Sequence, residues 1–284
     1  MKKVTLLINC KDQYNIIASV TGFIVNKNGN IVYLDQHVDR EQDIFFMRIE
    51  SEFEAATFHQ ENFKLEFKNT LAEKFNMQWR LYSEDEIPKL AIFVSKYDHC
   101  LYDLLGRYRS GELPVEVSFI ISNHTHLKHI ADKFAIPFYH IPVTKETKAK
   151  AEEEQLALLQ KHNIDFIVLA RYMQIITGKL ASEYPYKIIN IHHSFLPAFV
   201  GAKPYHSAFK RGVKIIGATS HYVTEELDAG PIIDQDVAKV SHTYSIDNLI
   251  ARGRDIEKTV LANAVKLHSN RKVMVYNNKT VVFS

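Results

Sequence analysis

Three polar side chains in the second half of the chain have the types and spacing that chemistry on a carbonyl group requires. Asn190 and His192 lie at the end of an apolar stretch, residues 186–191, that is typical of a buried strand. Residues two apart on a strand project to the same side, so we expect these two side chains to point together. Asp228 follows in a turn between two strand-like stretches, from which it can reach them. The sequence therefore predicts one site beyond a strand end.

An asparagine, a histidine and a carboxylate in one place can hydrolyse or transfer a carbonyl group. The amide nitrogen of Asn190 can donate a hydrogen bond to a developing oxyanion, which is worth about 3 kcal/mol in well-studied enzymes. His192 can donate a hydrogen bond or a proton, and Asp228 can orient it and accept a proton from water. The spacing alone leaves a second interpretation open, in which these residues satisfy backbone groups of loops and turns.

The pattern after residue 88 predicts the sheet that would hold this site. Strand-like and helical stretches alternate there, with strands at 90–95, 115–122, 166–170 and 187–191 and helices at 101–108, 127–134 and 149–161. This alternation is typical of a doubly wound α/β domain with a mainly parallel sheet, which binds ligands beyond the carboxyl ends of its strands. Later strands are expected at 214–223 and 232–240, a long helix at 246–267, and a terminal hairpin of 272–276 with 280–283.

The first eighty or so residues predict a separate, smaller domain. Strand-like stretches occur at 4–9, 31–37, 44–50 and 77–81, and helical apolar spacing occurs at 16–24 and 63–75. That order is βαββαβ, the ferredoxin-like arrangement. The acidic stretch 83–88 ends in proline and is interpreted as the linker. We therefore expect two domains, residues 1–84 and 85–284.

Composition and charge exclude several classes of partner. Of the 284 residues 46% are apolar, and the net charge of +2 comes from interspersed signs, so neither nucleic acid nor an anionic membrane is an expected partner. There is no membrane-spanning apolar run and no secretory signal, which predicts a cytoplasmic protein. Cys10 and Cys100 stand alone, and HExxH is absent, so neither a disulfide framework nor a metal site is predicted. A small molecule is the expected substrate.

The residues around the predicted site resemble the folate-dependent formyltransferase family. The resemblance covers the whole second domain through the segments Ile121–His124, Leu169–Ile176, Asn190–Pro197, His221–Thr224 and Leu227–Ile233. It implies that Asn190, His192 and Asp228 form the catalytic set that acts on the formyl group of 10-formyltetrahydrofolate. It also implies a folate pocket lined, largely through backbone contacts, by Met173, Gln174, Ile175, Ile176, Thr224, Glu225, Glu226 and Leu227.

The turn after the first strand of the second domain bears on transfer versus hydrolysis. A transferase acting on a phosphorylated amine must hold that phosphate, and a glycine-rich turn is the usual cradle. Here the turn is Ser95–Leu101, which contains no glycine. It resembles the Ser-Lys-x-x-His-Cys-Leu run of formyltetrahydrofolate deformylases, the members that give the formyl group to water. Further similarity to those enzymes lies in His193, Gly201–Tyr205, Gly253–Lys258, Val275–Tyr276 and Asn278–Phe283.

The resemblance implies hydrolysis of 10-formyltetrahydrofolate to formate and tetrahydrofolate. Water attacks the formyl carbon, Asn190 and His192 stabilise the oxyanion, and Asp228 orients or deprotonates the water. His192 then protonates the departing nitrogen. His193 is expected only in a supporting role, because adjacent strand residues face opposite ways. No cofactor is expected, since the folate is the substrate.

The first domain resembles ACT domains, some of which bind an amino acid between the first strand and the first helix. Asn15 stands where related enzymes commonly carry glycine, which argues against an effector and for a role in assembly. Free sheet edges favour self-association, so a homo-oligomer is expected. Two alternatives stay open: a formyltransferase with a non-phosphorylated amine acceptor, and a non-catalytic sensor of folate or amino acids.

Overall fold

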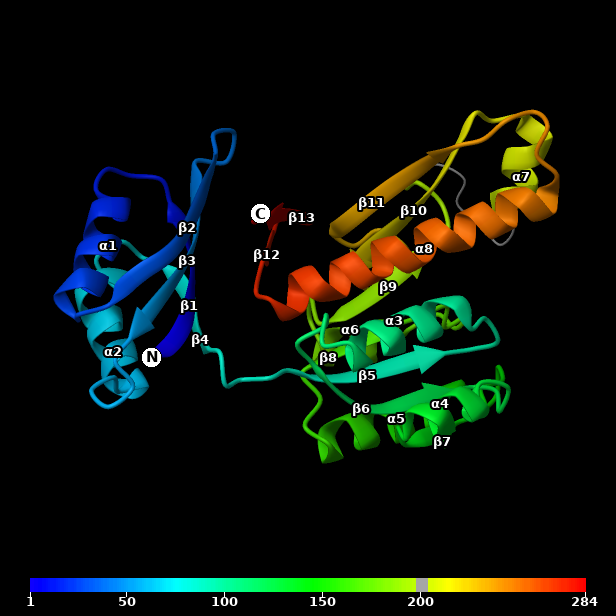
Figure 1. Cartoon of the computed structure of the whole chain (residues 1–284), viewed down its shortest axis with the longest axis horizontal. Coiled ribbons are helices and arrows are strands. Elements are labelled where there is room, and N and C mark those ends of the chain that lie inside the picture. Colours follow the sequence, from blue (N-terminus) through cyan, green and yellow to red (C-terminus); the bar gives the residue numbers. More distant parts are fainter. Residues whose placement is uncertain (198–203) are drawn as a thin grey trace. The chain divides into compact units, whose positions relative to one another are not determined.

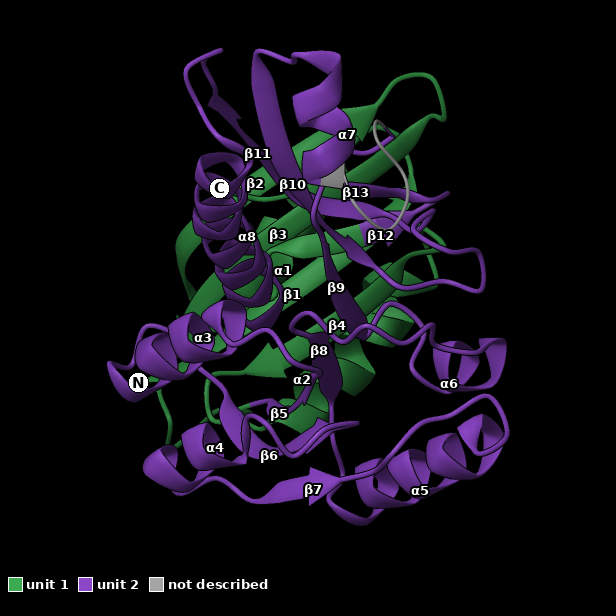
Figure 2. Cartoon of the chain, turned by 90° about the vertical axis from the view of Figure 1, so that its right-hand side faces the viewer, with its two compact units in different colours: residues 1–87, 271–274, 281–284 green, residues 88–270, 275–280 purple. Residues whose placement is uncertain are grey.

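A computed structural model describes residues 1–197 and 204–284, and these form two compact units (Figures 1 and 2). The first unit comprises residues 1–87, 271–274 and 281–284, and the second comprises residues 88–270 and 275–280. The change from one unit to the other at Ile87 and Pro88 falls inside the stretch interpreted as a linker. Two short segments near the carboxyl terminus group with the first unit, which differs from a simple division at residue 84.

The first unit is an antiparallel four-stranded sheet covered by helices. Its elements in chain order are β1 (Lys2–Lys11), α1 (Ile16–Asn26), β2 (Asn30–Asp39), β3 (Ile44–Phe53), α2 (Gln60–Phe67), a π-helical turn (Lys68–Ala72) and β4 (Gln78–Ser83). The strand order is β2-β3-β1-β4, which confirms the ferredoxin-like prediction and fits an ACT-like domain. Asn15 precedes α1 with φ 68°, the left-handed conformation that favours glycine.

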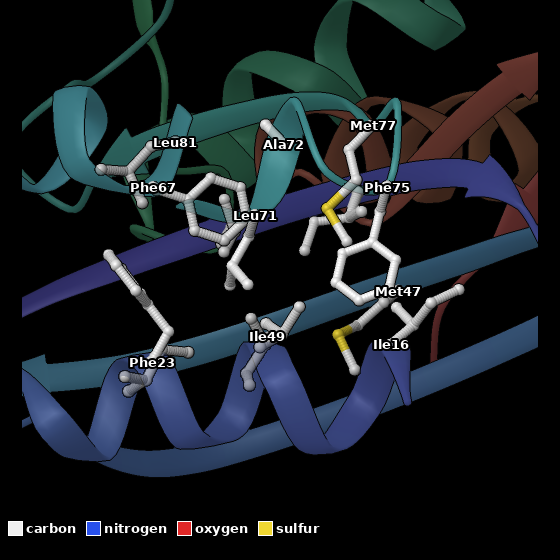
Figure 3. Packing of buried hydrophobic residues seen from close by; sticks show 14 of the residues in the cluster. Ile16, Phe23, Met47, Ile49, Phe67, Leu71, Ala72, Phe75, Met77 and Leu81 are labelled. Atoms are coloured by element: carbon white, nitrogen blue, oxygen red, sulfur yellow. The ribbon is translucent and has the colours of Figure 1, made fainter. Parts of the chain in front are cut away.

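The core of the first unit is built from the apolar stripes of its two helices. Phe23 of α1 makes edge contacts with Phe63 and Phe67 of α2, at centroid distances of 5.2 and 5.4 Å. Met47 and Ile49 of β3 lie buried in the same cluster, and Figure 3 shows them in this core together with Phe23 and Phe67. Burial of each such side chain stabilises the fold by about 1.5–3 kcal/mol. The apolar residues that recur at helical spacing in the sequence are therefore the residues that the two helices bury in the core.

The second unit holds a seven-stranded sheet with helices on its faces (Figure 1). Its elements are β5 (Lys89–Val94), α3 (His99–Arg109), β6 (Glu116–Ser122), α4 (Lys128–Phe134), β7 (Phe138–His140), α5 (Lys148–Lys161), β8 (Phe166–Leu169), α6 (Gly178–Glu183), β9 (Ile188–His192), α7 (Pro204–Arg211), β10 (Ile215–Tyr222), β11 (Ile232–Lys239) and α8 (Ile246–Ser269). The strand order is β11-β10-β9-β8-β5-β6-β7. Neighbouring strands from β9 to β7 are parallel, and β10 runs antiparallel to both of its neighbours, β9 and β11. The predicted doubly wound, mainly parallel domain is confirmed.

Three short elements of the second unit were not predicted from the sequence: β7, α6 and α7.

The predicted terminal hairpin is present and pairs β12 (Val273–Tyr276) with β13 (Lys279–Val282). Its turn residues Asn277 and Asn278 have φ values of 41° and 59°, as a two-residue hairpin turn with positive φ requires. None of the helices among the described residues is both long and apolar enough to cross a membrane.

A hydrogen-bonded serine ties together the turns that surround the predicted site. Ser95, just after β5, donates from Oγ to Oδ1 of Asn123 after β6, at 2.6 Å. The same Oγ accepts from the backbone N–H of Met173 after β8, at 3.0 Å. Because Ser95 is buried, these bonds hold three carboxyl-terminal turns of the parallel sheet in one arrangement.

Candidate active site

The pairing of two strands brings three of the site side chains together. Asn190 and His192 are the third and last residues of β9. The antiparallel neighbour β10 places His221 directly opposite Asn190 in the ladder. Directly opposed residues on neighbouring strands lie within side-chain reach. The amide nitrogen Nδ2 of Asn190 accordingly lies 3.2 Å from Nε2 of His221.

Asp228 reaches this strand pair from the loop between β10 and β11. Its Oδ2 lies 3.2 Å from Nδ1 of His192, and its Oδ1 lies 3.6 Å from Nε2 of His221. Hydrogen bonds from His192 and then His221 hold the pKa of the Asp228 carboxyl well below its usual value, although partial burial opposes this. The residue has φ 54°, the left-handed backbone that aspartate tolerates better than most residues.

Gly230 allows the Asp228 loop to fold back onto β10. A Cβ atom on this glycine would lie 1.8 Å from the carbonyl oxygen of Tyr222, so no other residue fits without a shift of the backbone. The backbone N–H of Tyr222 donates to the carbonyl of Pro231 at 2.9 Å and fastens the loop's return. The short Leu227–Pro231 segment is therefore a turn built to present Asp228.

Oxygen atoms beside the two histidines show which of their ring nitrogens donate. His221 donates from Nδ1 to the carbonyl of Tyr222 at 2.9 Å, and its Nε2 faces both Nδ2 of Asn190 and Oδ1 of Asp228. His192 donates from Nδ1 to Asp228. Within the described part of the chain, Nε2 of His192 is buried and has no hydrogen-bond partner. A buried polar atom of this kind marks the group left for a ligand.

A cavity of about 350 Å³ adjoins this cluster. It is lined by all three predicted catalytic residues and all eight predicted folate-contacting residues: Met173, Gln174, Ile175, Ile176, Asn190, His192, Thr224, Glu225, Glu226, Leu227 and Asp228. Met173, Ile175 and Leu227 are 48, 57 and 59% exposed. Apolar side chains beside a few convergent polar groups are typical of small-molecule pockets. The cavity has the size and lining for a small organic ligand.

Three lining residues with basic side chains are not among the predicted catalytic or folate-contacting residues: Arg171, His193 and His221. His221 belongs to a segment that resembles the formyltransferase family, but the sequence assigned no role to this residue. The argument that His193 faces away from His192 was wrong, because β9 ends at His192 and strand alternation stops there. The two rings are stacked at 5.3 Å. Burial, followed by the charge of Arg171, lowers the pKa of His193 from 6.5 to about 4.

The expected similarity at Gly201–Tyr205 falls partly outside the described residues, because residues 198–203 are not described. Tyr205 is described and buried on α7. Gly253, in the other similar segment, lies on α8, where an added Cβ would meet the ring of Tyr205 at 2.2 Å. The two segments therefore meet in space, and the contact requires glycine.

Comparison with known proteins identifies the family of the chain. A family model described as formyl transferase matches residues 88–265. A formyltetrahydrofolate deformylase of Synechocystis is 50% identical over 99% of this chain and 98% of its own length, and that of Bacillus subtilis is 45% identical over 99 and 94%. The crystal structure of a formyltetrahydrofolate deformylase from Pseudomonas syringae has a TM-score of 0.96 and 47% identity, covering all of this chain and 95% of that one. The chain belongs to the formyltetrahydrofolate deformylase family.

Proposed function

We propose that this chain hydrolyses 10-formyltetrahydrofolate to formate and tetrahydrofolate, with Asn190, His192 and Asp228 as the catalytic residues. The observation that supports this most directly is the buried, unpartnered Nε2 of His192 among the described residues, on a ring oriented by Asp228. An imidazole held in this way can exchange a proton with a reacting group. Family membership supports the choice of substrate, and the geometry of the three side chains supports the proposed roles.

In the proposed reaction, water adds to the formyl carbon and the carbon–nitrogen bond to N10 breaks. As water adds, His192 Nε2 takes up the proton that the water loses. The addition places negative charge on the formyl oxygen, which accepts hydrogen bonds from Asn190 Nδ2 and from the newly protonated His192 Nε2. His192 Nε2 then gives this proton to N10 as the bond breaks. The products are tetrahydrofolate and formic acid, which ionises to formate.

Asp228 orients the water and the imidazole in this proposal, and it stabilises the imidazolium form of His192. Its lowered pKa makes it a weak base, which disfavours removal of a proton from water by the carboxylate alone. A carboxylate 3.2 Å from Nδ1 supports the positive ring that has taken up a proton. His221 is a positioning residue, because it contacts both Asp228 and Asn190.

The folate is proposed to lie along the two loops that line the cavity. Met173, Ile175 and Leu227 would cover the flat rings, and their exposure in the chain supports this role. The backbone of residues 173–176 and 224–227 would supply hydrogen bonds to the pterin. Gly178 supports the close approach of the two loops, because an added Cβ there would lie 3.3 Å from the carboxyl carbon of Glu225.

The reaction balances with water as the co-substrate, so the proposal includes neither cofactor nor metal. We also propose that the protein acts in the cytoplasm as a homo-oligomer. The two cysteines are free and buried, which suits a reducing compartment. The first unit has β2 and β4 at the edges of its sheet, and β2 exposes Val32 and Leu34. An edge of this kind is a template for pairing with a second copy.

Formate release from 10-formyltetrahydrofolate tests the proposal. Purified protein should release formate and tetrahydrofolate in equal amounts without an added amine. Asn190→Ala should lower the rate roughly 100- to 1000-fold, as removal of an oxyanion donor does elsewhere. Turnover that requires an amine would instead indicate a transferase, and folate binding without turnover would indicate a sensor.

A further inference from the structure

A buried carboxylate outside the catalytic set joins four elements of the second unit. Glu257 of α8 is 1% exposed. Its Oε1 accepts from the hydroxyl of Tyr205 at 2.6 Å, and its Oε2 lies 2.8 Å from Nε2 of His99. Nε of Arg171 lies 3.4 Å from the same Oε2. α3, the loop after β8, α7 and α8 therefore meet at one side chain.

The charges of this cluster are matched inside the protein. Burial opposes ionisation of Glu257, but the hydrogen bond from His99, the charge of Arg171 and the hydrogen bond from Tyr205 outweigh it and keep the pKa below its usual value. The carboxylate is therefore ionised and balances the guanidinium of Arg171. Breaking such a buried pair leaves an uncompensated charge, so each partner depends on the other.

The cluster contains residue types that bind metal ions, but the carboxylate of Glu257 already bonds to other side chains of the protein. His99, Cys100 and Glu257 bring their ligand atoms within 4.8 Å of one another in the described chain. Both oxygens of Glu257 accept hydrogen bonds, and the Arg171 cation stands beside them. Burial raises the pKa of the Cys100 thiol well above its usual value, so the thiol stays protonated. An internal ion pair accounts for the cluster better than a cation does.

The cluster is continuous with the wall of the candidate active site. Arg171 and His193 line the cavity. The ring of His193 lies 5.3 Å from that of His192 on one side and 6.1 Å from that of Tyr205 on the other. Arg171 has φ 63°, a backbone conformation that favours glycine, and its guanidinium carbon lies 5.0 Å from the centroid of the Tyr97 ring. Glu257 thus holds a strained arginine against the site.

The same side chains lie beside the amino-terminal end of helix α3. Helix α3 begins at His99, directly after the turn that follows β5. The amino terminus of a helix at the carboxyl end of a parallel strand is suited to a phosphate or a carboxylate. Here the carboxylate of Glu257 bonds to the imidazole of His99, the first residue of the helix, and the guanidinium of Arg171 lies over the ring of Tyr97 in the turn.

We propose that Glu257 determines the choice of nucleophile by holding Arg171 and, through Tyr205, the ring of His193 in the wall of the cavity, so that this wall admits water and excludes an amine. Glu257 is a positioning residue here, because it acts through Arg171 and Tyr205 and does not touch the reacting atoms. The inference rests on the proposed hydrolysis. In a variant with an opened wall, the amine nitrogen bonds to the formyl carbon, the bond to N10 breaks, the amine loses a proton and N10 gains one.

The test measures where the formyl group goes in the presence of hydroxylamine or glycinamide. Tetrahydrofolate release counts all turnovers, formate counts those with water, and the formylated amine is measured by mass spectrometry. Wild-type protein should release formate equal to tetrahydrofolate at every amine concentration. Glu257→Gln and His99→Ala should transfer a measurable fraction of the formyl group to the amine, at least ten times the detection limit of the assay. Asp255→Asn is the matched control, since this exposed carboxylate on α8 pairs with Lys258 and should behave as wild type.

The outcomes separate the two proposals. If wild-type protein releases neither formate nor tetrahydrofolate, the proposed function fails. If it releases formate but the folded Glu257→Gln and His99→Ala proteins keep the wild-type partition, the inference about Glu257 is wrong. Should Glu257→Gln not fold, Tyr205→Phe removes a single hydrogen bond to the carboxylate and must still shift the partition.

Discussion

The carboxylate of Asp228 lies 3.2 Å from Nδ1 of His192, and this contact joins a loop residue to a strand end 36 positions away in the chain (228 − 192). It fixes the tautomer of His192 and leaves Nε2 for a ligand.

The first prediction concerns this contact between Asp228 and His192. Asp228→Asn keeps the shape but removes the charge that stabilises the imidazolium, so formate release should fall by about 10²- to 10⁴-fold. Steady-state assays of formate give the measurement, and near-normal turnover would contradict the role.

His221 should act on catalysis through Asp228. His221→Ala removes the second of the two hydrogen bonds that lower the Asp228 pKa, so that pKa should rise. A carboxylate with a raised pKa loses its charge at a higher pH, and the acid limb of the activity profile should move toward neutrality. A pH–rate profile of wild type and variant gives the measurement. An unchanged acid limb with lowered activity would point to Asn190 as the contact that matters.

Gly230 and Gly106 form a matched pair of glycine substitutions. Gly230→Ala would place a methyl group 1.8 Å from the Tyr222 carbonyl and should displace the Asp228 loop, with a loss of both stability and formate release. Gly106 lies inside α3, where an added Cβ meets nothing within 4 Å. Gly106→Ala should therefore raise the free energy of unfolding by up to about 1 kcal/mol. Thermal unfolding and the formate assay on both variants test the contrast.

His193 should make stability depend on pH. Its pKa lies at about 4 in the folded chain and near 6.5 when exposed, so the unfolded chain binds more protons between these values. Its contribution is complete above pH 6.5 and is lost as the pH falls toward 4. Between pH 7 and pH 5 the loss amounts to about 2 kcal/mol.

A variant without the imidazole separates this contribution from that of other titrating groups. His193→Gln should show a loss of unfolding free energy smaller by that amount when urea unfolding is compared at pH 7 and pH 5. His126→Gln, at an exposed histidine, is the control and should follow wild type. Parallel curves for wild type and His193→Gln would show that His193 is not held neutral.

Much of the fold could be predicted because its signals are local. Apolar spacing along α1, α5 and α8 repeats with the helical period over several turns, and the strands of both sheets are continuous β-rich runs. The missed elements β7, α6 and α7 have three, six and eight residues, too few for a period to stand out. The joining of residues 271–274 and 281–284 to the first unit depends on long-range contacts, which no local pattern encodes.

The sequence by itself determined the residue types of the site and the strand end that carries Asn190 and His192. It could do so because residues two apart on a strand project to the same side. It also supplied the resemblance that pointed to folate chemistry. Only the tertiary structure decided that His221 stands opposite Asn190, that His193 stacks on His192, and that Glu257 pairs with Arg171, which lines the cavity. Strand pairing and helix packing bring such side chains together across long stretches of chain, and their distances depend on every element between them.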